Sequence, residues 1–291
     1  MEEEKIQAEK KTYCEILRRV MQEKGYEDDY IFRCLSYAEG LLERDLPVIF
    51  DKLHIGQILK MQGVKSDYYS SFYIVGKSGK RRTICAPSRR MKERQRWILE
   101  HILEKIQISE NCEGFAKGHS IVTNAKKHVG QEYILTVDIQ DFFTSITQKQ
   151  VQEVFMEAGY TEEVSECLAE LCCCEGRLPQ GAPTSPCIAN IVCREMDKEL
   201  AELAAEKKII YTRYADDMIF SADTDTSAYL AEITEIIHSH GFLLNDKKTR
   251  IQSGPYKLVT GLVVGKDTIR VPKGFKRILL QEIRGVCPSG K

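Results

Sequence analysis

Two adjacent aspartates, Asp216 and Asp217, are the residues whose position in this chain most strongly suggests chemistry. The segments on either side of them, residues 209–213 and 218–221, are apolar and rich in β-formers, which predicts a hairpin with both acids at its turn. Two carboxylates about 4 Å apart repel each other by roughly 4 kcal/mol at an effective dielectric of about 20. A bound cation would offset this repulsion, whereas the simpler interpretation is a solvated acidic turn.

A third acid, Asp138, ends a predicted buried strand over residues 133–139. A carboxylate in such a strand needs a partner, because burying an unpaired charge is costly. An acid at a strand end and an acid pair on a hairpin can converge at one edge of a sheet. Carboxylate oxygens suit Mg²⁺, which usually takes one or two protein carboxylates together with substrate phosphates. Two such ions can activate an attacking hydroxyl and stabilise a departing pyrophosphate.

The composition indicates a chain with ample core and no membrane segment. Of its 291 residues, 43% are hydrophobic and 29% are charged, which is enough for one or two domains. No apolar run approaches the length of about 18 residues that a bilayer requires, and the first residues do not form a signal peptide. The eleven cysteines, including the run 172–174, are interpreted as reduced structural thiols because no CxxC pair completes a zinc site. We therefore expect a cytoplasmic protein.

The net charge of −1 conceals an uneven distribution of charge along the chain. Residues 1–50 carry an excess of acids, whereas residues 77–96 and 247–277 are strongly basic. Two separate basic segments in a neutral chain favour a charged groove for nucleic acid. The alternative is a pair of solvated surfaces.

Helices and short strands interleave in this sequence, which predicts an α+β fold. The helices expected from apolar periodicity cover residues 1–44 with a break at Gly25, 91–108, 151–158 and 161–174, with one more after Pro186 and another that ends at His240. Residues 68–75 and 80–86 are expected to pair as a basic hairpin joined by residues 77–79.

Four segments of the chain resemble motifs A to D of reverse transcriptases and occur in the same order. They are residues 135–143 (LTVDIQDFF), 178–186 (LPQGAPTSP), 214–217 (YADD) and 241–249. Two shorter segments, 124–128 (NAKKH) and 259–261 (VTG), match the signatures NAxxH and VTG of the retron enzymes within that family. The resemblance covers residues 70–277.

The resemblance implies a right-hand polymerase fold, in which helices flank an antiparallel palm sheet. The domains that it implies are fingers over residues 1–114, a first part of the palm over 115–147, a fingers insertion over 148–184, a second part of the palm over 185–263, and a thumb over 264–291. The family usually has a longer helical thumb, so either this thumb is unusually short or the chain ends early.

The same resemblance assigns the three acids. Asp138, Asp216 and Asp217 match the catalytic carboxylates that bind two Mg²⁺ ions, for which Mn²⁺ can substitute, and Ile139 joins them in the predicted metal-binding set. Lys248 matches the lysine of motif D that protonates the departing pyrophosphate, with Lys247 as its competitor.

A nucleotide site is also implied. Phe143 matches the aromatic residue that excludes a ribose 2′-OH, so dNTPs are the expected substrates, and a core aromatic residue is the alternative. The other predicted nucleotide contacts are Lys80 and Arg82 on the basic hairpin, Asp141 and Phe142 in motif A, and Gln180 and Gly181 in the motif B loop. The sequence does not decide which of Lys80, Arg81 and Arg82 clamps the triphosphate.

RNA contacts are predicted in three places. Asn124 and His128 would share one helical face, either as RNA contacts or as a buried polar pair that holds the fingers to the palm. Thr260 and Gly261 would contact RNA or form a bend between two strands. The basic residues Arg89, Arg90 and Arg94 complete the predicted RNA-binding set.

The function implied is that of a retron-type, RNA-directed DNA polymerase. It would copy part of a structured noncoding RNA into single-stranded DNA, starting from a 2′-OH of that RNA. The partners implied are this RNA, its DNA product, dNTPs and a separate effector protein in anti-phage defence, with no membrane. Three alternatives stay open: a group II intron-type enzyme, a diversity-generating enzyme, and an RNA-binding scaffold that restrains an effector.

Overall fold

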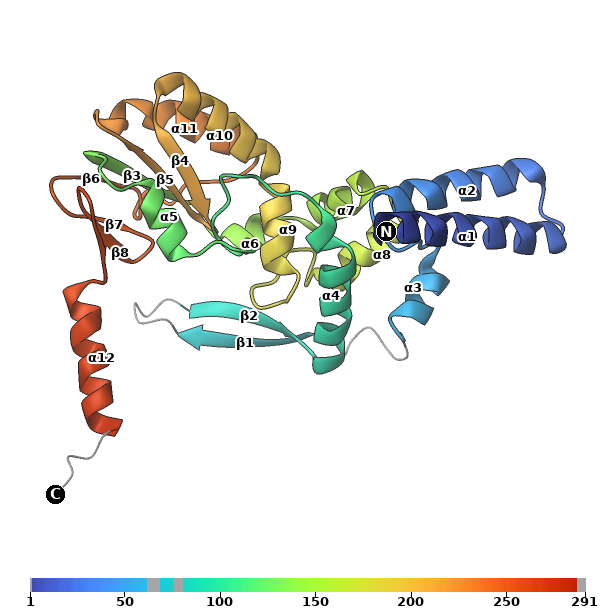
Figure 1. The fold of residues 1–291 in the computed structure, drawn as a ribbon. Helices are drawn as coiled ribbons and strands as arrows, with labels where there is room; N and C mark the ends of the chain where they lie inside the picture. The colour runs from blue at the N-terminus through green and yellow to red at the C-terminus, as the bar shows by residue number, and fades with distance from the viewer. Residues whose placement is uncertain (1, 62–68, 76–80, 287–291) are drawn as a thin grey trace. The chain divides into compact units, whose positions relative to one another are not determined.

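The fold was analysed in a computed structural model that describes residues 2–61, 69–75 and 81–286 (Figure 1). The chain divides into two compact units. Unit 1 comprises residues 1–107 and 146–188, and unit 2 comprises residues 108–145 and 189–291. The expected division into fingers, palm and thumb, with boundaries at residues 114, 147, 184 and 263, stays a prediction.

Unit 1 is mainly helical. Its helices are α1 (Glu2–Glu23), α2 (Asp28–Glu43), α3 (Lys52–Ile58), α4 (Arg89–His101), the 3₁₀ turn η2 (Leu103–Lys105), α7 (Gln148–Glu157), α8 (Glu162–Cys172) and the first part of α9 (Ser185–Val192). Helices α1 and α2 pack through Met21, Ile31 and Leu35. The expected break at Gly25 is confirmed, because this glycine has a φ of 76° that ends the helical backbone.

The basic hairpin of unit 1 is also confirmed. Strands β1 (Tyr69–Val75) and β2 (Arg81–Pro87) pair antiparallel, from Tyr69 opposite Pro87 to Val75 opposite Arg81. Arg82 lies in β2 opposite Ile74. Lys80 and the connecting residues 77–79 lie outside the described residues.

Two predicted helices end earlier than expected. Helix α4 stops at His101, because Ile102 leaves the helical conformation with φ −121° and ψ −63° before the 3₁₀ turn. Helix α8 stops at Cys172, since Cys173 is extended and Cys174 pairs with Arg177 in an isolated β-bridge. The three consecutive cysteines therefore do not share a helix.

Unit 2 is built on an antiparallel sheet of four strands in the order β4-β5-β3-β6. The strands are β3 (Tyr133–Asp138), β4 (Ile210–Tyr214), β5 (Asp217–Ala222) and β6 (Arg250–Ser253). A second sheet consists of β7 (Lys257–Val259), β8 (Leu262–Val264) and β9 (Ile269–Arg270). The hairpin of β4 and β5 confirms the predicted turn around the acid pair.

Helices cover both faces of the four-stranded sheet (Figure 1). A cluster of Ala125, Ile134, Ile219, Val259, Leu262 and Val264 packs helix α5 (Ile121–Lys127) and the β7–β8 hairpin on one face. Helix α10 (Arg194–Lys207) contacts β4 on the opposite face, next to α11 (Leu230–Ser239). The remaining elements of unit 2 are α6 (Phe142–Ser145), η3 (Thr226–Tyr229) and α12 (Lys273–Val286).

Helix α12 occupies the segment expected to begin a thumb. It exposes several large apolar side chains, namely Phe275, Ile278, Leu279, Leu280 and Ile283. Within the parts of the chain that the structure describes, no helix combines the length and the apolar character needed to cross a membrane.

Candidate active site

The three predicted acids converge at one end of the four-stranded sheet. Asp138 is the last residue of β3, and Asp217, the first residue of β5, is its cross-strand partner. Asp216 lies in the turn between β4 and β5, where its carbonyl oxygen accepts a hydrogen bond of 3.0 Å from the Ile139 amide. The antiparallel register therefore brings together acids that are far apart in the sequence.

Negative charge is concentrated at this point. Burial, followed by the charges of Asp216 and Asp138, raises the pKa of Asp217 to about 6. Burial also raises the pKa of Asp216, and the nearby Asp138 adds to this shift. Ionising all three acids together is therefore unfavourable without a neighbouring positive charge.

Two side chains of the loop between α11 and β6 donate hydrogen bonds to Asp138. Lys248 Nζ donates to Asp138 Oδ2 at 2.6 Å, and Asn245 Nδ2 donates to Oδ1 at 3.1 Å. Burial opposes the charge of Lys248, but its hydrogen bond to Asp138 and the surrounding acids raise its pKa overall. The structure thus brings the predicted motif D lysine into direct contact with Asp138.

The donor atoms at this site fit a divalent cation. Three carboxylates provide the hard oxygen ligands that Mg²⁺ prefers, and the raised pKa values of Asp216 and Asp217 indicate that a cation would relieve the repulsion at this site. The Ile139 side chain has no atom that can bind a metal ion, so only the carbonyl oxygen of this residue would serve as a ligand. As the described residues stand, however, no three acidic, histidine or cysteine side chains converge tightly enough to hold an ion. A metal ion at Asp138 Oδ2 would compete with the hydrogen bond from Lys248.

The predicted nucleotide residues of motif A follow β3. Asp141 is exposed and has a φ of 49°, a conformation that turns the chain into α6. Phe142 is buried and its ring lies 5.4 Å from that of Phe143 and 6.1 Å from that of Phe242. Phe143 itself is half-buried. The side chain of Phe142 therefore supports Phe143 instead of facing a nucleotide.

The predicted nucleotide residues of motif B belong to unit 1. Gln180 and Gly181 are exposed in the loop before α9, and Gly181 has a φ of 109° that favours glycine. The Ser185 hydroxyl donates to the Pro179 carbonyl at 2.6 Å and so fastens this loop. Gln180 is accordingly presented on a constrained loop.

The pair Asn124 and His128 lies in the core of unit 2, with both side chains 0% exposed. Asn124 accepts a hydrogen bond of 2.6 Å from the Thr212 hydroxyl and donates one of 3.4 Å to the hydroxyl of Thr260. His128 bonds to Thr212 through Nε2 and to Ser221 through Nδ1, both at 2.7 Å. The structure contradicts direct RNA contact by these side chains. It also corrects the alternative, because they join α5 to strands of the same unit and not the fingers to the palm.

This network defines which ring nitrogen of a neutral His128 carries the proton. The single proton of Thr212 goes to Asn124, so Thr212 must accept from His128 Nε2, and Nδ1 is left to accept from Ser221. Burial, with a contribution from Lys127, lowers the pKa of His128 to about 4. The histidine is therefore neutral in the folded protein and charged in the unfolded chain below its ordinary value of 6.5.

We expect this buried histidine to make the fold acid-sensitive. The pKa of His128 is lower in the folded protein than in the unfolded chain. Its neutral form therefore contributes fully to the stability of the fold above pH 6.5, and this contribution is lost as the pH falls towards about 4. Between pH 7 and pH 5 the free energy of unfolding should fall by about 2 kcal/mol from this group alone. Urea unfolding of the wild type and of His128→Gln at both pH values measures the effect, and an equal pH dependence in the two proteins would contradict it.

Thr260 and Gly261 form the two-residue turn between β7 and β8. Their φ values of 42° and 82° are those of the tight hairpin turns that match strand twist. The Thr260 hydroxyl also donates to the carbonyl of Ile121 at 3.4 Å. Thr260 thus ties the turn to α5, while the exposed Gly261 remains a predicted RNA contact.

The predicted basic RNA contacts on α4 separate into two kinds. Arg94 is buried and donates to the carbonyls of Leu59 and Lys60, each at 3.2 Å, so it holds unit 1 together and the predicted RNA contact is wrong for it. Arg89 and Arg90 are exposed in the first turn of the helix. Arg89 forms an exposed ion pair with Glu93 at 3.3 Å. Because positive charge in the first turn opposes the helix dipole, a bound anion would stabilise both arginines there.

Neutralising both exposed arginines should weaken RNA binding through its salt dependence. The logarithm of the binding constant falls with the logarithm of the salt concentration, and each lost phosphate contact makes this negative slope shallower by roughly 0.7 to 0.9. The double variant Arg89→Gln with Arg90→Gln should therefore reduce the magnitude of the slope by between about one and two. Fluorescence anisotropy with a labelled RNA hairpin over a salt series provides the measurement. Arg33→Gln, an exposed arginine of the acidic helix α2, is the matched control. An unchanged slope would place the RNA elsewhere.

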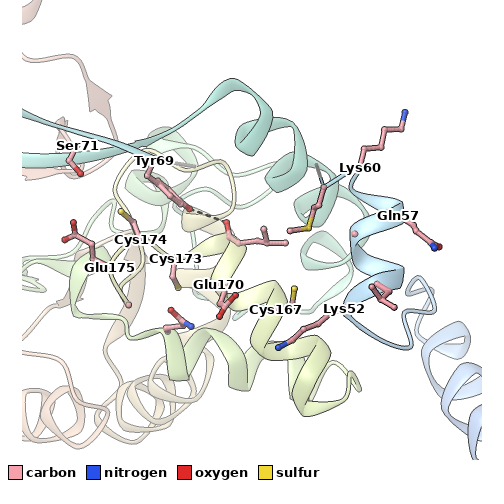
Figure 2. A pocket seen from close by; sticks show the side chains of 16 residues that line it. Lys52, Gln57, Lys60, Tyr69, Ser71, Cys167, Glu170, Cys173, Cys174 and Glu175 are labelled. Atoms are coloured by element: carbon pink, nitrogen blue, oxygen red, sulfur yellow. Dashed lines mark hydrogen bonds between the residues drawn. The ribbon is translucent and has the colours of Figure 1, made fainter. Parts of the chain in front are cut away.

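Unit 1 contains a cavity of about 1190 Å³ between α3, β1 and α8 (Figure 2). Cys167, Cys173 and Cys174 line it, and the Tyr69 hydroxyl donates to the Leu171 carbonyl at 3.3 Å on its wall. Burial is the main cause that raises the pKa of both Cys173 and Cys174 to about 12, so these thiols are protonated at neutral pH. This agrees with the structural role expected for the cysteine run.

Several supports of the site were not predicted. Asn245 binds Asp138, and Arg213, Asp197 and Asn190 form a buried network beneath the acid turn. Arg213 had a visible signal in the sequence, since it is a lone charge in an apolar strand, as Asp138 is. Asn245, in a polar loop, had none.

Known proteins resemble this chain over most of its length. It matches the family described as reverse transcriptase (RNA-dependent DNA polymerase) over residues 70–271. It is 39% identical over 235 residues to the Retron Ec86 reverse transcriptase of Escherichia coli, and this match covers 78% of this chain and 72% of that protein. It is 35% identical over 248 residues to the Retron Mx162 reverse transcriptase of Myxococcus xanthus, and this match covers 73% of this chain and 51% of that protein. The chain thus spans only half the length of the second relative.

Solved structures show a similar fold. Telomerase from Candida albicans in complex with a fragment of telomeric RNA superimposes with a TM-score of 0.53 at 14% identity, over 84% of this chain and 50% of that one. At this identity the likeness concerns the fold alone. Helices with antiparallel sheets, in the arrangement of a right-hand polymerase, are therefore common to both chains.

Proposed function

Because this chain belongs to the reverse transcriptases, and within them to the retron enzymes, we propose that it copies part of a structured noncoding RNA into single-stranded DNA by two-metal nucleotidyl transfer. The observation that carries the chemical part of this proposal is the convergence of Asp138, Asp216 and Asp217 at one end of the sheet of unit 2. The retron relatives favour this assignment over a group II intron-type or a diversity-generating enzyme.

The residues of the site have distinct parts in the proposed reaction. Reverse transcriptases depend on divalent metal ions, and these ions when bound activate the attacking hydroxyl and neutralise the triphosphate. Asp138 and Asp217, as cross-strand partners, would hold the ions from one side and Asp216 from the turn. Lys248, once released from Asp138, would donate a proton to the departing pyrophosphate. Asn245 would keep Asp138 oriented throughout.

The nucleotide would be a dNTP selected by Phe143. Its half-buried ring rests on the buried Phe142, so it is held firmly enough to exclude a 2′-OH by its bulk. Asp141, Gln180 and Gly181 are proposed as further nucleotide contacts. Lys80 and Arg82 are proposed to clamp the triphosphate from the basic hairpin.

The proposed partners follow from this chemistry. A structured RNA supplies both the template and the 2′-OH that starts synthesis, and it would be bound in part by Arg89, Arg90 and Gly261. We further propose a separate effector protein, a role in anti-phage defence and a cytoplasmic location.

The nucleic acid that copurifies with the protein tests the proposal directly. It would be sequenced before and after treatment with RNase and with debranching enzyme, with the Asp216→Asn variant as the matched control. A short DNA joined to RNA by a debranchable bond, present only with the wild type, is the expected result. RNA without DNA in both preparations would indicate an RNA-binding scaffold. Linear DNA would support the polymerase activity but contradict the proposed start of synthesis at a 2′-OH.

A further inference from the structure

Arg213, the residue before the Tyr214–Asp217 turn, is a fully buried charge in the core of unit 2. Its side chain is 0% exposed, and it is the largest of the fully buried side chains. A buried guanidinium is tolerated only when its hydrogen-bond donors are paired, because an unpaired buried charge costs several kcal/mol, about 3 to 5 in typical cases. Its contacts therefore indicate what it is there to hold.

Those contacts divide between an acid and the acid turn. Nε and Nη2 donate to the two carboxylate oxygens of Asp197 on α10, at 2.8 and 2.7 Å, which is the strong bidentate arrangement. Nη1 donates to Asn190 Oδ1 at 3.0 Å and to the carbonyl of Ala215 at 3.2 Å. Tyr211 completes the pairing of Asp197 by donating to Oδ1 at 2.7 Å. One guanidinium thus ties the buried face of α10 to the main chain of the turn.

Arg213 acts from the face of the sheet opposite Asp138 and Asp217, two of the predicted metal ligands. Cross-strand partners share a face, so Asp138, Asp217 and Tyr214 lie on one side of the sheet. Arg213 precedes Tyr214 in the strand and therefore points to the other side, where α10 packs. It can fix the position of the turn without neutralising the acids that would bind metal.

The turn itself requires such support. Ala215 has a φ of 57°, a left-handed conformation that costs a non-glycine residue about 1 to 2 kcal/mol. A strained residue of this kind persists only where its surroundings determine it fully. The carbonyl that Arg213 holds belongs to this strained residue, next to Asp216.

The segment around Gly114 closes on the same turn. The amide of Glu113 donates to the Arg213 carbonyl at 2.7 Å, and Asn190 Nδ2 donates to the Gly114 carbonyl at 2.9 Å. A Cβ at Gly114 would lie 2.5 Å from the amide nitrogen of Ala215, so only glycine allows this approach. The turn is therefore held by Arg213 on one side and by this segment on another.

We propose that Arg213, paired with Asp197, is a positioning residue that holds Ala215 in its left-handed conformation and thereby sets Asp216 and Asp217 for metal binding. The inference rests on the proposed metal-binding role of these two acids. Changes in residues that orient metal ligands typically reduce metal affinity by about 10- to 100-fold. Loosening the turn should therefore weaken the binding of divalent ions more than it weakens the fold.

The test measures Mn²⁺ binding to the full chain by electron paramagnetic resonance, without RNA or nucleotide. Arg213→Lys keeps the charge opposite Asp197, but a single amine cannot reach both carboxylate oxygens and the Ala215 carbonyl. Gly114→Ala pushes on the turn from the other side and leaves Arg213 intact. Both variants should bind Mn²⁺ about tenfold more weakly or worse. Both should also need more Mg²⁺ for half-maximal DNA synthesis.

Tyr211→Phe is the matched control, because it removes a hydrogen bond to Asp197 in the same network without touching the turn. It should lower the melting temperature but leave Mn²⁺ binding at the wild-type level. Arg213→Lys or Gly114→Ala binding Mn²⁺ as tightly as Tyr211→Phe would overturn the positioning role. Asp216→Asn sets the reference: if it binds Mn²⁺ like the wild type, the proposed metal site fails and the inference fails with it.

Discussion

Replacing Asp216 by Asn is expected to abolish DNA synthesis while the protein remains folded and able to bind RNA. Bound metal ions supply several kcal/mol of transition-state stabilisation, and a loss of about 4 kcal/mol corresponds to roughly 1,000-fold in rate. Asn keeps the size of the side chain and removes only the charge. Primer extension with a defined RNA template measures the loss, which should be about 1,000-fold or more.

The same substitution should not destabilise the protein. The pKa of Asp216 is raised in the fold by burial and by Asp138, which means that its ionised form is disfavoured there. An acid whose folded pKa is raised lowers the stability of the fold progressively above its unfolded pKa of 3.8, and neutral Asn removes this cost. The melting temperature at neutral pH should therefore stay the same or rise. Asp217→Asn should behave alike, since its pKa is raised to about 6.

These two readouts separate a metal ligand from a merely structural acid. A structural acid would lose stability on replacement, and activity would follow the folded fraction. Synthesis at more than a tenth of the wild-type rate by Asp216→Asn would contradict the metal assignment, since the expected loss is about 1,000-fold. RNA binding measured in parallel confirms that the variant is intact.

Replacing Phe143 by Ala is expected to admit ribonucleotides. Discrimination by a clash in a packed pocket is typically worth about 1 to 3 kcal/mol, which corresponds to roughly 10- to 200-fold. The ratio of kcat/KM for dNTP over NTP should fall by about this factor, mostly through a gain with NTP. Single-nucleotide incorporation with matched dNTP and NTP concentrations provides the measurement.

The neighbouring aromatic residue Phe242 gives a control for this experiment. It is buried and packs on Phe142, whose ring in turn contacts Phe143. Phe242→Leu should cost roughly 1 kcal/mol of stability through poorer packing and leave the selectivity ratio unchanged. If Phe143→Ala keeps the wild-type ratio as well, Phe143 is a core residue and the sugar is selected elsewhere.

Much of the fold was predictable because its signals are local. The break between α1 and α2 depends on one glycine, and the hairpin of β4 and β5 on two apolar runs around a pair of acids. The start of α9 at Ser185 follows from a proline in its first turn. Helix ends were less predictable, because α8 stops where Cys174 finds a bridge partner in Arg177, a contact outside the helix itself.

The candidate site was predictable for a similar reason. Asp138 stood out as an acid at the end of an apolar strand, and the acid pair as the turn of a hairpin. Their convergence was an expectation that needed only antiparallel pairing to be realised. The family motifs added the assignment of roles, which neither spacing nor hydropathy supplies.

Burial was the quantity that the sequence by itself did not determine. Asn124, His128 and Arg94 are polar or basic residues next to exposed ones of the same type, and only the packed structure shows that they are inside. The reason is physical: whether a polar side chain faces solvent depends on which distant groups satisfy it, such as Thr212 for His128.

Arg213 and Asp138 show most clearly what the sequence determines and what only the tertiary structure decides. The sequence alone determined that each is a lone charge in an apolar strand, and hence that each needs a partner. The tertiary structure alone decided that they face opposite sides of one sheet, with Asp138 beside Lys248 and Arg213 on Asp197. Strand alternation places a side chain on one of two faces, but the helix or loop that covers that face is brought there by contacts between residues far apart in the chain.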